Sequence, residues 1–291
     1  MSRLHAIAFT LVMLGLSGTA LAAEDANPDP AQNRALRADT RVDMYFGGIK
    51  LGHVDMVTRL EGQAYAMEAK MRTGGLVGLF VENFADLESE GELIEGGVSP
   101  HEYRASYGKG DTLERVTKLI FEDSTAVMLE ADPPYDKKNK AADYPLEERE
   151  GAIDPMSAAL FGATARMQEG LCEGVIKIFD GRRRYNLKLS YVGESELSSF
   201  RKDRYTGKAE HCKLVFERLR WKQGDFELDP KVKTFGPYDI WFARFPAPDG
   251  GEEMLAPVKF VAPLEFGAVV AHMSKIDLKP LETAANHAAP N

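Results

Sequence analysis

The chain has 291 residues, of which 44% are hydrophobic and 28% charged. This composition is too apolar for a disordered chain and too rich in charge for a bundle of membrane-spanning helices. Asp and Glu number 45 against 36 Lys and Arg, so the formal net charge is −9. An acidic balance argues against bulk nucleic-acid binding, which depends on clustered Lys and Arg.

Residues 1–22 have the three parts of a secretory signal peptide. Arg3 supplies a short positive segment, residues 6–16 are almost all apolar, and Ala20-Leu21-Ala22 supplies the small-x-small pattern of a cleavage site. The apolar run is shorter than the roughly 20 residues needed to span a bilayer. We therefore expect cleavage after Ala22, export to the periplasm, and no transmembrane span in the mature protein. Residues 23–40 are polar and predict a flexible leader.

The cysteine content agrees with export. Cys172 and Cys212 are the only cysteines of the chain, and an even count in an exported protein predicts one disulfide bond. Closing a loop of this length stabilises a fold by about 4 kcal/mol in the chain-entropy model. A metal-binding pair or a nucleophilic thiol is the alternative interpretation.

From residue 41 onward, short apolar strands alternate with turns. Residues 42–46 and 49–60 flank a Gly-Gly turn and predict a first hairpin, and residues 63–72 alternate strictly between apolar and polar side chains. Later strands are expected at residues 101–107, 113–121, 126–130, 174–179, 182–192, 213–221, 238–245, 254–261 and 269–277. This pattern predicts a mainly β protein, with an antiparallel curved sheet, half-barrel or barrel-like, in a single domain over residues 41–277.

One or two short helices are expected to pack on this sheet. Asp154 suits the N-cap and Pro155 the first position of a helix over residues 155–168. Its predicted buried stripe consists of Met156, Ala159, Leu160, Ala163 and Met167. A short helical turn is expected near residues 75–81. Residues 131–150 predict either a mobile surface loop or a lid, and residues 278–291 a disordered tail.

The Asp180-Gly181 pair predicts a two-residue hairpin turn. That register sets Arg183 opposite Ile178 and beside Tyr185, on the apolar surface of the hairpin, and points Arg184 to the opposite, solvated side. Two interpretations of Arg183 stay open. Its guanidinium either reaches solvent or an acid from the hairpin tip, or it holds a carboxylate or phosphate at the rim of an apolar cavity.

Several stretches carry a resemblance to a known family. They are Tyr45-Phe46-Gly47-Gly48-Ile49-Lys50-Leu51-Gly52, Ile153-Asp154-Pro155-Met156-Ser157-Ala158, Phe179-Asp180-Gly181-Arg182-Arg183-Arg184-Tyr185, Tyr205-Thr206-Gly207-Lys208-Ala209 with Cys212, Ile240-Trp241-Phe242, and Ala256-Pro257-Val258-Lys259-Phe260. Over residues 41–277 the chain resembles a bacterial envelope family catalogued as domain of unknown function 3108. The resemblance implies an exported, β-rich protein of Gram-negative bacteria, and it supplies no catalytic residues.

Motifs of enzymes are absent from the sequence. There is no nucleophile elbow, zinc-binding helix motif, phosphate-binding loop or calcium loop, and the histidines lack metal-ligand spacing. We therefore assign no catalytic residue, no metal and no cofactor.

The expected function is that of a non-catalytic periplasmic binding protein, which holds a lipid or other apolar ligand for maintenance of the cell envelope. The candidate ligand-binding residues are Arg183, Tyr185, Trp241 and Phe242, the last two from an aromatic run that also includes Phe235, Tyr238 and Phe245. One alternative is a structural or scaffold protein with a filled core that acts through an envelope protein partner. Another is a hydrolase that pairs Asp180 with a histidine. No nucleic-acid partner is expected.

Overall fold

The computed structural model describes residues 35–74, 78, 82–134, 144–164, 172–219, 233–248 and 253–281. The predicted signal peptide lies outside these residues, as does the predicted tail from residue 282 onward. Of the helical turn predicted near residues 75–81, only Gly78 is described.

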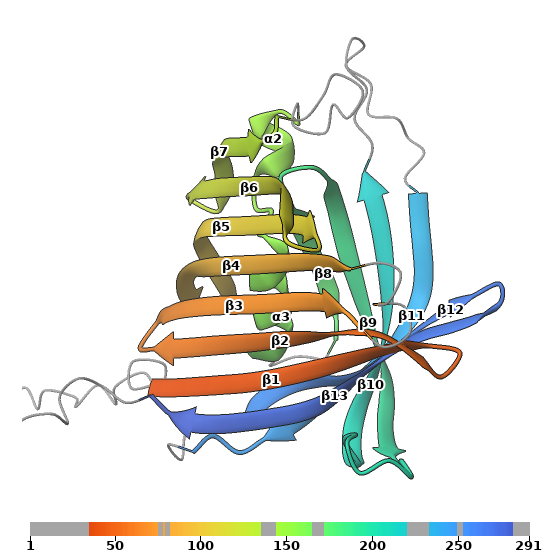
Figure 1. Cartoon of the computed structure of the whole chain (residues 1–291). Helices are drawn as coiled ribbons and strands as arrows, with labels where there is room; N and C mark the ends of the chain where they lie inside the picture. The colour runs from red at the N-terminus through yellow and green to blue at the C-terminus, as the bar shows by residue number, and fades with distance from the viewer. Residues whose placement is uncertain are drawn as a thin grey trace, which may run out of the picture.

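Thirteen strands of the described chain form one antiparallel sheet (Figure 1). The first seven are β1 (Ala35–Phe46), β2 (Ile49–Glu61), β3 (Ala64–Thr73), β4 (Asn83–Ile94), β5 (Gly97–Lys109), β6 (Thr112–Glu122) and β7 (Thr125–Asp132). The other six are β8 (Gly174–Phe179), β9 (Arg184–Leu197), β10 (Gly207–Leu219), β11 (Lys233–Phe245), β12 (Met254–Leu264) and β13 (Gly267–Pro280). Consecutive strands pair within each group, and β1 pairs with β13 to join the two groups.

Residues 150–153 connect the two ends of this sheet, which are β7 and β8. Glu150 pairs with Thr125 at the start of β7, and Ile153 pairs in parallel with Ile178 of β8. The Ile153 N–H donates to the Lys177 carbonyl at 3.0 Å, and the Phe179 N–H donates to the Ile153 carbonyl at 2.9 Å. These bonds bring the curved sheet close to a closed barrel, so the predicted barrel-like antiparallel fold is confirmed.

The domain is slightly longer than the predicted span of residues 41–277. β1 begins at Ala35, inside the predicted leader, and β13 extends to Pro280, inside the predicted tail. Cross-strand pairing explains both differences, because Leu36 pairs with Pro280 and Ala38 with Leu278. The first and last strands of the domain therefore stabilise each other by pairing.

Two short helices follow β7, and the longer of them contacts the sheet. These are α2 (Leu146–Arg149) and α3 (Pro155–Thr164). α3 contacts β4, β5, β8 and β12, and Figure 1 shows it behind β2–β5, between them and β8. Its Met156, Ala158 and Leu160 are buried in the main hydrophobic core. The predicted stripe was wrong at Ala159, which is exposed. Strands contact α3 on several sides, so its buried residues do not form one narrow stripe.

The described end of the predicted loop at residues 131–150, from residue 144 onward, packs on the barrel. Tyr144 is buried, and its ring meets Phe179 edge-on at 5.9 Å between centroids. The guanidinium of Arg149 lies 5.0 Å from the same ring. The described residues from 144 onward therefore cover one face of the β8–β9 hairpin.

A buried hydrogen-bond network fixes the start of α3. Asp154 is fully buried, and its carboxylate accepts hydrogen bonds from the Met156 N–H at 2.8 Å and the Ser157 N–H at 3.0 Å. The hydroxyls of Ser157 and, at 3.1 Å, of Ser89 on β4 bond its second oxygen. The Ser157 hydroxyl also bonds the Tyr65 hydroxyl of β3 at 2.6 Å. Asp154 is thus the N-cap of the helix and its anchor to two strands.

The predicted disulfide is confirmed. Cys172 and Cys212 are bonded, with their Cα atoms 6.0 Å apart, and both are fully buried. Cys172 directly precedes the edge strand β8, and Cys212 lies on β10, two strands away. The bond therefore ties the sheet edge to a strand that does not pair with it.

Replacing both cysteines, Cys172→Ala with Cys212→Ala, is expected to lower the free energy of unfolding by about 2–4 kcal/mol, because the unfolded chain regains the freedom of a 40-residue loop. Urea unfolding of oxidised protein measures the change. The wild type in reductant serves as the control and should match the double variant. A wild-type midpoint insensitive to reductant would contradict the prediction.

Neighbouring residues of α3 form a matched pair for testing its burial. Ala158→Arg should lower the free energy of unfolding by more than about 2 kcal/mol, since a charge must be buried or the helix displaced. Ala159→Arg should have little effect, because Ala159 is exposed. Thermal unfolding of both variants gives the comparison, and equal losses would show that α3 is buried all round.

Asp154→Ala should cost about 2–4 kcal/mol, because it removes the helix cap and leaves buried donors without an acceptor. Asp154→Asn keeps one acceptor oxygen and should cost less. Burial raises the pKa of Asp154, opposed by its hydrogen bonds to Ser157 and Ser89. The wild type should therefore lose stability relative to Asp154→Asn as the pH rises from about 4 through the folded-state pKa. If the difference in unfolding free energy between the wild type and Asp154→Asn did not change with pH, a raised pKa of Asp154 would be contradicted.

Candidate functional site

The β8–β9 turn has a different register from the predicted one. Phe179 pairs with Arg184 and Ile178 with Tyr185, so the turn contains four residues, Asp180 to Arg183, instead of two. The Asp180 carboxylate accepts hydrogen bonds from the N–H groups of Arg182, at 2.8 Å, and Arg183, at 2.5 Å. These bonds to the Asp180 side chain stabilise the longer turn. The predicted two-residue turn was wrong.

Packing on distant strands also fixes this turn. Gly181 has φ +82°, and a Cβ atom there would lie 2.6 Å from Thr117 Cγ2 of β6 and 3.1 Å from Leu129 Cδ1 of β7. Only glycine fits both the backbone conformation and the space. The turn of the hairpin therefore lies directly on the opposite end of the sheet.

The new register changes the roles of two arginines. Arg183 is exposed in the turn and does not lie opposite Ile178. Arg184, predicted to be solvated, is 4% exposed and donates to the Glu148 carbonyl at 2.8 Å and to the Asn186 side chain at 2.8 Å. The prediction for Arg184 was wrong because residues 144–149 cover that face of the hairpin.

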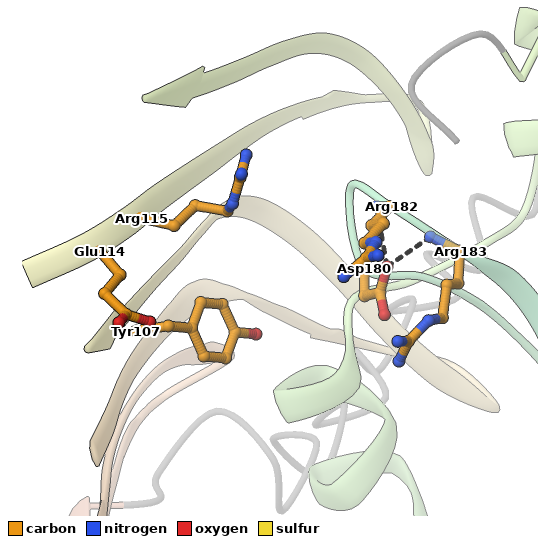
Figure 2. Close-up of a pocket in the computed structure, with 6 residues that line it drawn as sticks. All are labelled: Tyr107, Glu114, Arg115, Asp180, Arg182 and Arg183. Atoms are coloured by element: carbon orange, nitrogen blue, oxygen red, sulfur yellow. Dashed lines mark hydrogen bonds between the residues drawn. The ribbon is translucent and has the colours of Figure 1, made fainter. Parts of the chain in front are cut away.

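A cleft of about 340 Å³ lies between this turn and strands β5 and β6. Figure 2 shows Tyr107, Glu114 and Arg115 on one side and the turn residues on the other. The described lining residues are Tyr107, Glu114, Arg115, Asp180, Arg182 and Arg183. The cleft thus contains one ligand-binding candidate from the sequence, Arg183, together with Asp180, which the sequence names only for the hydrolase alternative.

The charges of the cleft favour an anion. Its lining has three arginines against two acids, and the Asp180 carboxylate is turned to backbone N–H groups. Burial raises the pKa of Asp180, while the N–H groups of Arg182 and Arg183 oppose that rise. Arg115 donates to the Pro133 carbonyl at 2.6 Å. The guanidinium of Arg183 makes no hydrogen bond to any other described residue, so its donors face the cleft and solvent.

The structure does not bring the other three candidates to this cleft. Tyr185 stacks on Phe216 of β10, with centroids 4.5 Å apart, and burial raises its pKa. Trp241 of β11 stacks on His211 at 4.5 Å. Phe242, on the same strand, is 4% exposed and packs in a cluster with the two cysteines. As ligand-binding residues these three stay predictions.

Sequence reasoning missed Tyr107, Glu114, Arg115 and Asp180 as partners of Arg183. Tyr107, Glu114 and Arg115 lie on strands far from the hairpin in sequence, and no local pattern indicates that β5 and β6 meet its turn. The charged run around Arg183 was the only available signal, and it identifies one side of the cleft.

The described residues lack both a metal-binding cluster and a helix that could cross a membrane. They contain no group of three or more His, Cys, Asp or Glu side chains placed to hold a metal ion. No helix among them has the length and apolar character needed to cross a membrane.

Comparison with known proteins adds a family and a distant structure. No curated protein matches the chain. A solved structure, described as the crystal structure of a beta-barrel-like protein of domain of unknown function DUF1849 from Brucella abortus, is similar with 14% sequence identity and a TM-score of 0.44, covering 84% of this chain and 97% of that one. The model of a family described as "Protein of unknown function (DUF3108)" matches residues 41–274. The chain therefore belongs to the DUF3108 family, which confirms the resemblance of its sequence motifs.

Proposed function

We propose that this protein is an exported, non-catalytic binding protein of the bacterial cell envelope, and that it holds a lipid-like ligand by an anionic head group. The observation that carries the proposal is the arginine-lined cleft of about 340 Å³ at the seam of the barrel. Carboxylates and phosphates are the groups that arginine binds best, through charge-assisted and often bidentate hydrogen bonds.

The surroundings of the cleft suit an amphiphilic ligand. Arg183 offers its guanidinium without a competing hydrogen bond in the described chain, and the ring of Tyr107 adds apolar surface to the same cleft. Tyr107 is itself 39% exposed, so an apolar chain that covers its ring would remove apolar surface from water.

Export is supported by the buried disulfide between Cys172 and Cys212, because such bonds persist in oxidising compartments. The signal-like segment at residues 1–22 gives independent support. The periplasm is therefore the compartment that we propose.

A structural or scaffold role is the second candidate, and one observation favours it. α3 contacts strands from both halves of the sheet, and its Met156 and Leu160 contribute to the hydrophobic core. A lipid chain would have to bind at the margin of the sheet instead of displacing this helix. A protein with a filled core would act through its surface, in contact with an envelope partner.

Removing the charge of Arg183 should distinguish the two roles. Arg183→Ala is expected to weaken binding of a fluorescent fatty acid about ten- to a hundredfold, the contribution of one charge-assisted hydrogen bond, with an unchanged melting temperature. Lys188→Ala is the matched control, because it removes one positive charge from the same hairpin outside the cleft. It should change the affinity by less than about twofold.

The neutral methyl ester of the same fatty acid tests the role of the head group, and its affinity should not depend on Arg183. If Arg183→Ala and Lys188→Ala weaken fatty-acid binding equally, the weaker binding follows from the loss of overall positive charge and not from a contact with Arg183. Absence of fatty-acid binding by the wild type would count against the binding role and favour the scaffold role.

A further inference from the structure

A second cavity lies where the chain between β9 and β10 folds against β12 and β13. Its volume is about 280 Å³, and none of its lining residues belongs to the arginine cleft. The polar lining comes from Ser198, Ser199, Arg204, Tyr205, Lys259 and His272, and the apolar lining includes Val261 and Val270. The cavity combines three basic side chains and three hydroxyls with an apolar wall, and the Tyr205 hydroxyl already donates to the Lys208 carbonyl.

Aromatic rings hold two of these basic groups in place. The guanidinium carbon of Arg204 lies 5.2 Å from the centroid of the Tyr45 ring, and the Lys259 Nζ lies 4.6 Å from that of Trp241. The face of a ring attracts a cation without neutralising its charge. The Nε atom of Arg204 is buried and has no hydrogen-bond partner in the described part of the chain.

Three acids near the cavity are paired with other bases. Asp43 is bonded to Lys50 at 2.6 Å, and Asp203 to Arg201 at 3.2 Å. Asp239 is bonded to Lys213 and to His211, each at 2.6 Å. Within the described residues, Arg204, Lys259 and His272 form no ion pair with a carboxylate. The positive charges of Arg204 and Lys259 are therefore available to a ligand.

The pKa of His272 reflects its burial and the positive charges around it. Its ring meets Tyr45 edge-on, with centroids 6.4 Å apart. Burial, followed by the charges of Arg204 and Lys259, lowers the pKa of His272 to about 4. The imidazole is thus neutral at pH 7, and its N–H group can still donate to an oxyanion.

We infer that this cavity is an oxyanion site for a phosphate group, with room for a short apolar substituent against Val261 and Val270. Arg204 and Lys259 supply charge, and Ser198, Ser199 and His272 supply neutral hydrogen-bond donors. Free phosphate and the phosphate of an alkyl ester or lipid head group share this chemistry. The apolar wall is what would select between them.

Calorimetric titration of the full mature chain with inorganic phosphate and with hexyl phosphate tests the site. Arg204→Gln is expected to weaken binding about tenfold or more. Lys202→Gln is the matched control, because Lys202 is an exposed base of the same β9–β10 connection and does not line the cavity. It should change the affinity by less than about twofold. Lys259→Gln provides a second loss variant on a different strand, in case Arg204→Gln alters folding.

The two probes identify the source of the phosphate. Tighter binding of hexyl phosphate assigns the site to an alkyl phosphate, and equal binding assigns it to free phosphate. Arg183→Ala should leave both affinities unchanged, which separates this site from the arginine cleft. Absence of binding by the wild type, or equal losses for Lys202→Gln and Arg204→Gln, overturns the inference.

Discussion

The fold depends on one buried carboxylate. Placing Asp154 in the core is tolerable only because both of its oxygens accept hydrogen bonds, from two N–H groups of α3 and from the hydroxyls of Ser157 and Ser89. Ser89 belongs to β4, so the same bonds set the helix at a defined place on the sheet. Residues 150–153, which join β7 to β8, directly precede this cap. The segment that closes the barrel therefore runs directly into the cap that fixes the helix on the sheet.

The arginine cleft depends on that closure, because its two sides come from opposite ends of the sheet. Arg115 is on β6, near one end, and the turn with Arg182 and Arg183 leaves β8 at the other. Contact between Gly181 and Thr117 holds the two ends together. A ligand that bridges these residues would bind only the closed sheet. It would therefore stabilise the barrel by mass action, in addition to any contact that it makes with a single strand.

Local patterns in the sequence are sufficient for most of the strands, the disulfide and the helix cap at Asp154, because each follows from nearby residues or from the pair of cysteines. The strand β4 (Asn83–Ile94) is not among the strands expected from the sequence. The predictions were wrong where contacts between distant parts of the chain determine the local structure. The turn at Asp180 is four residues long because Gly181 packs on β6 and β7. Ala159 is exposed and Ala158 buried because strands from both halves surround α3. The partners of Arg183 follow from the closure of the sheet, which no periodicity reveals.

The charge distribution limits how such a protein binds anions. The chain carries a net charge of −9, yet both described cavities are lined by an excess of basic side chains. Long-range attraction cannot guide an anion to an acidic protein, and salt screens charges beyond about 8 Å. Affinity must come from short, partly desolvated contacts with groups such as Arg183 and Arg204. Sites of this kind discriminate between anions by the fit of the head group and of its apolar part, in addition to its charge.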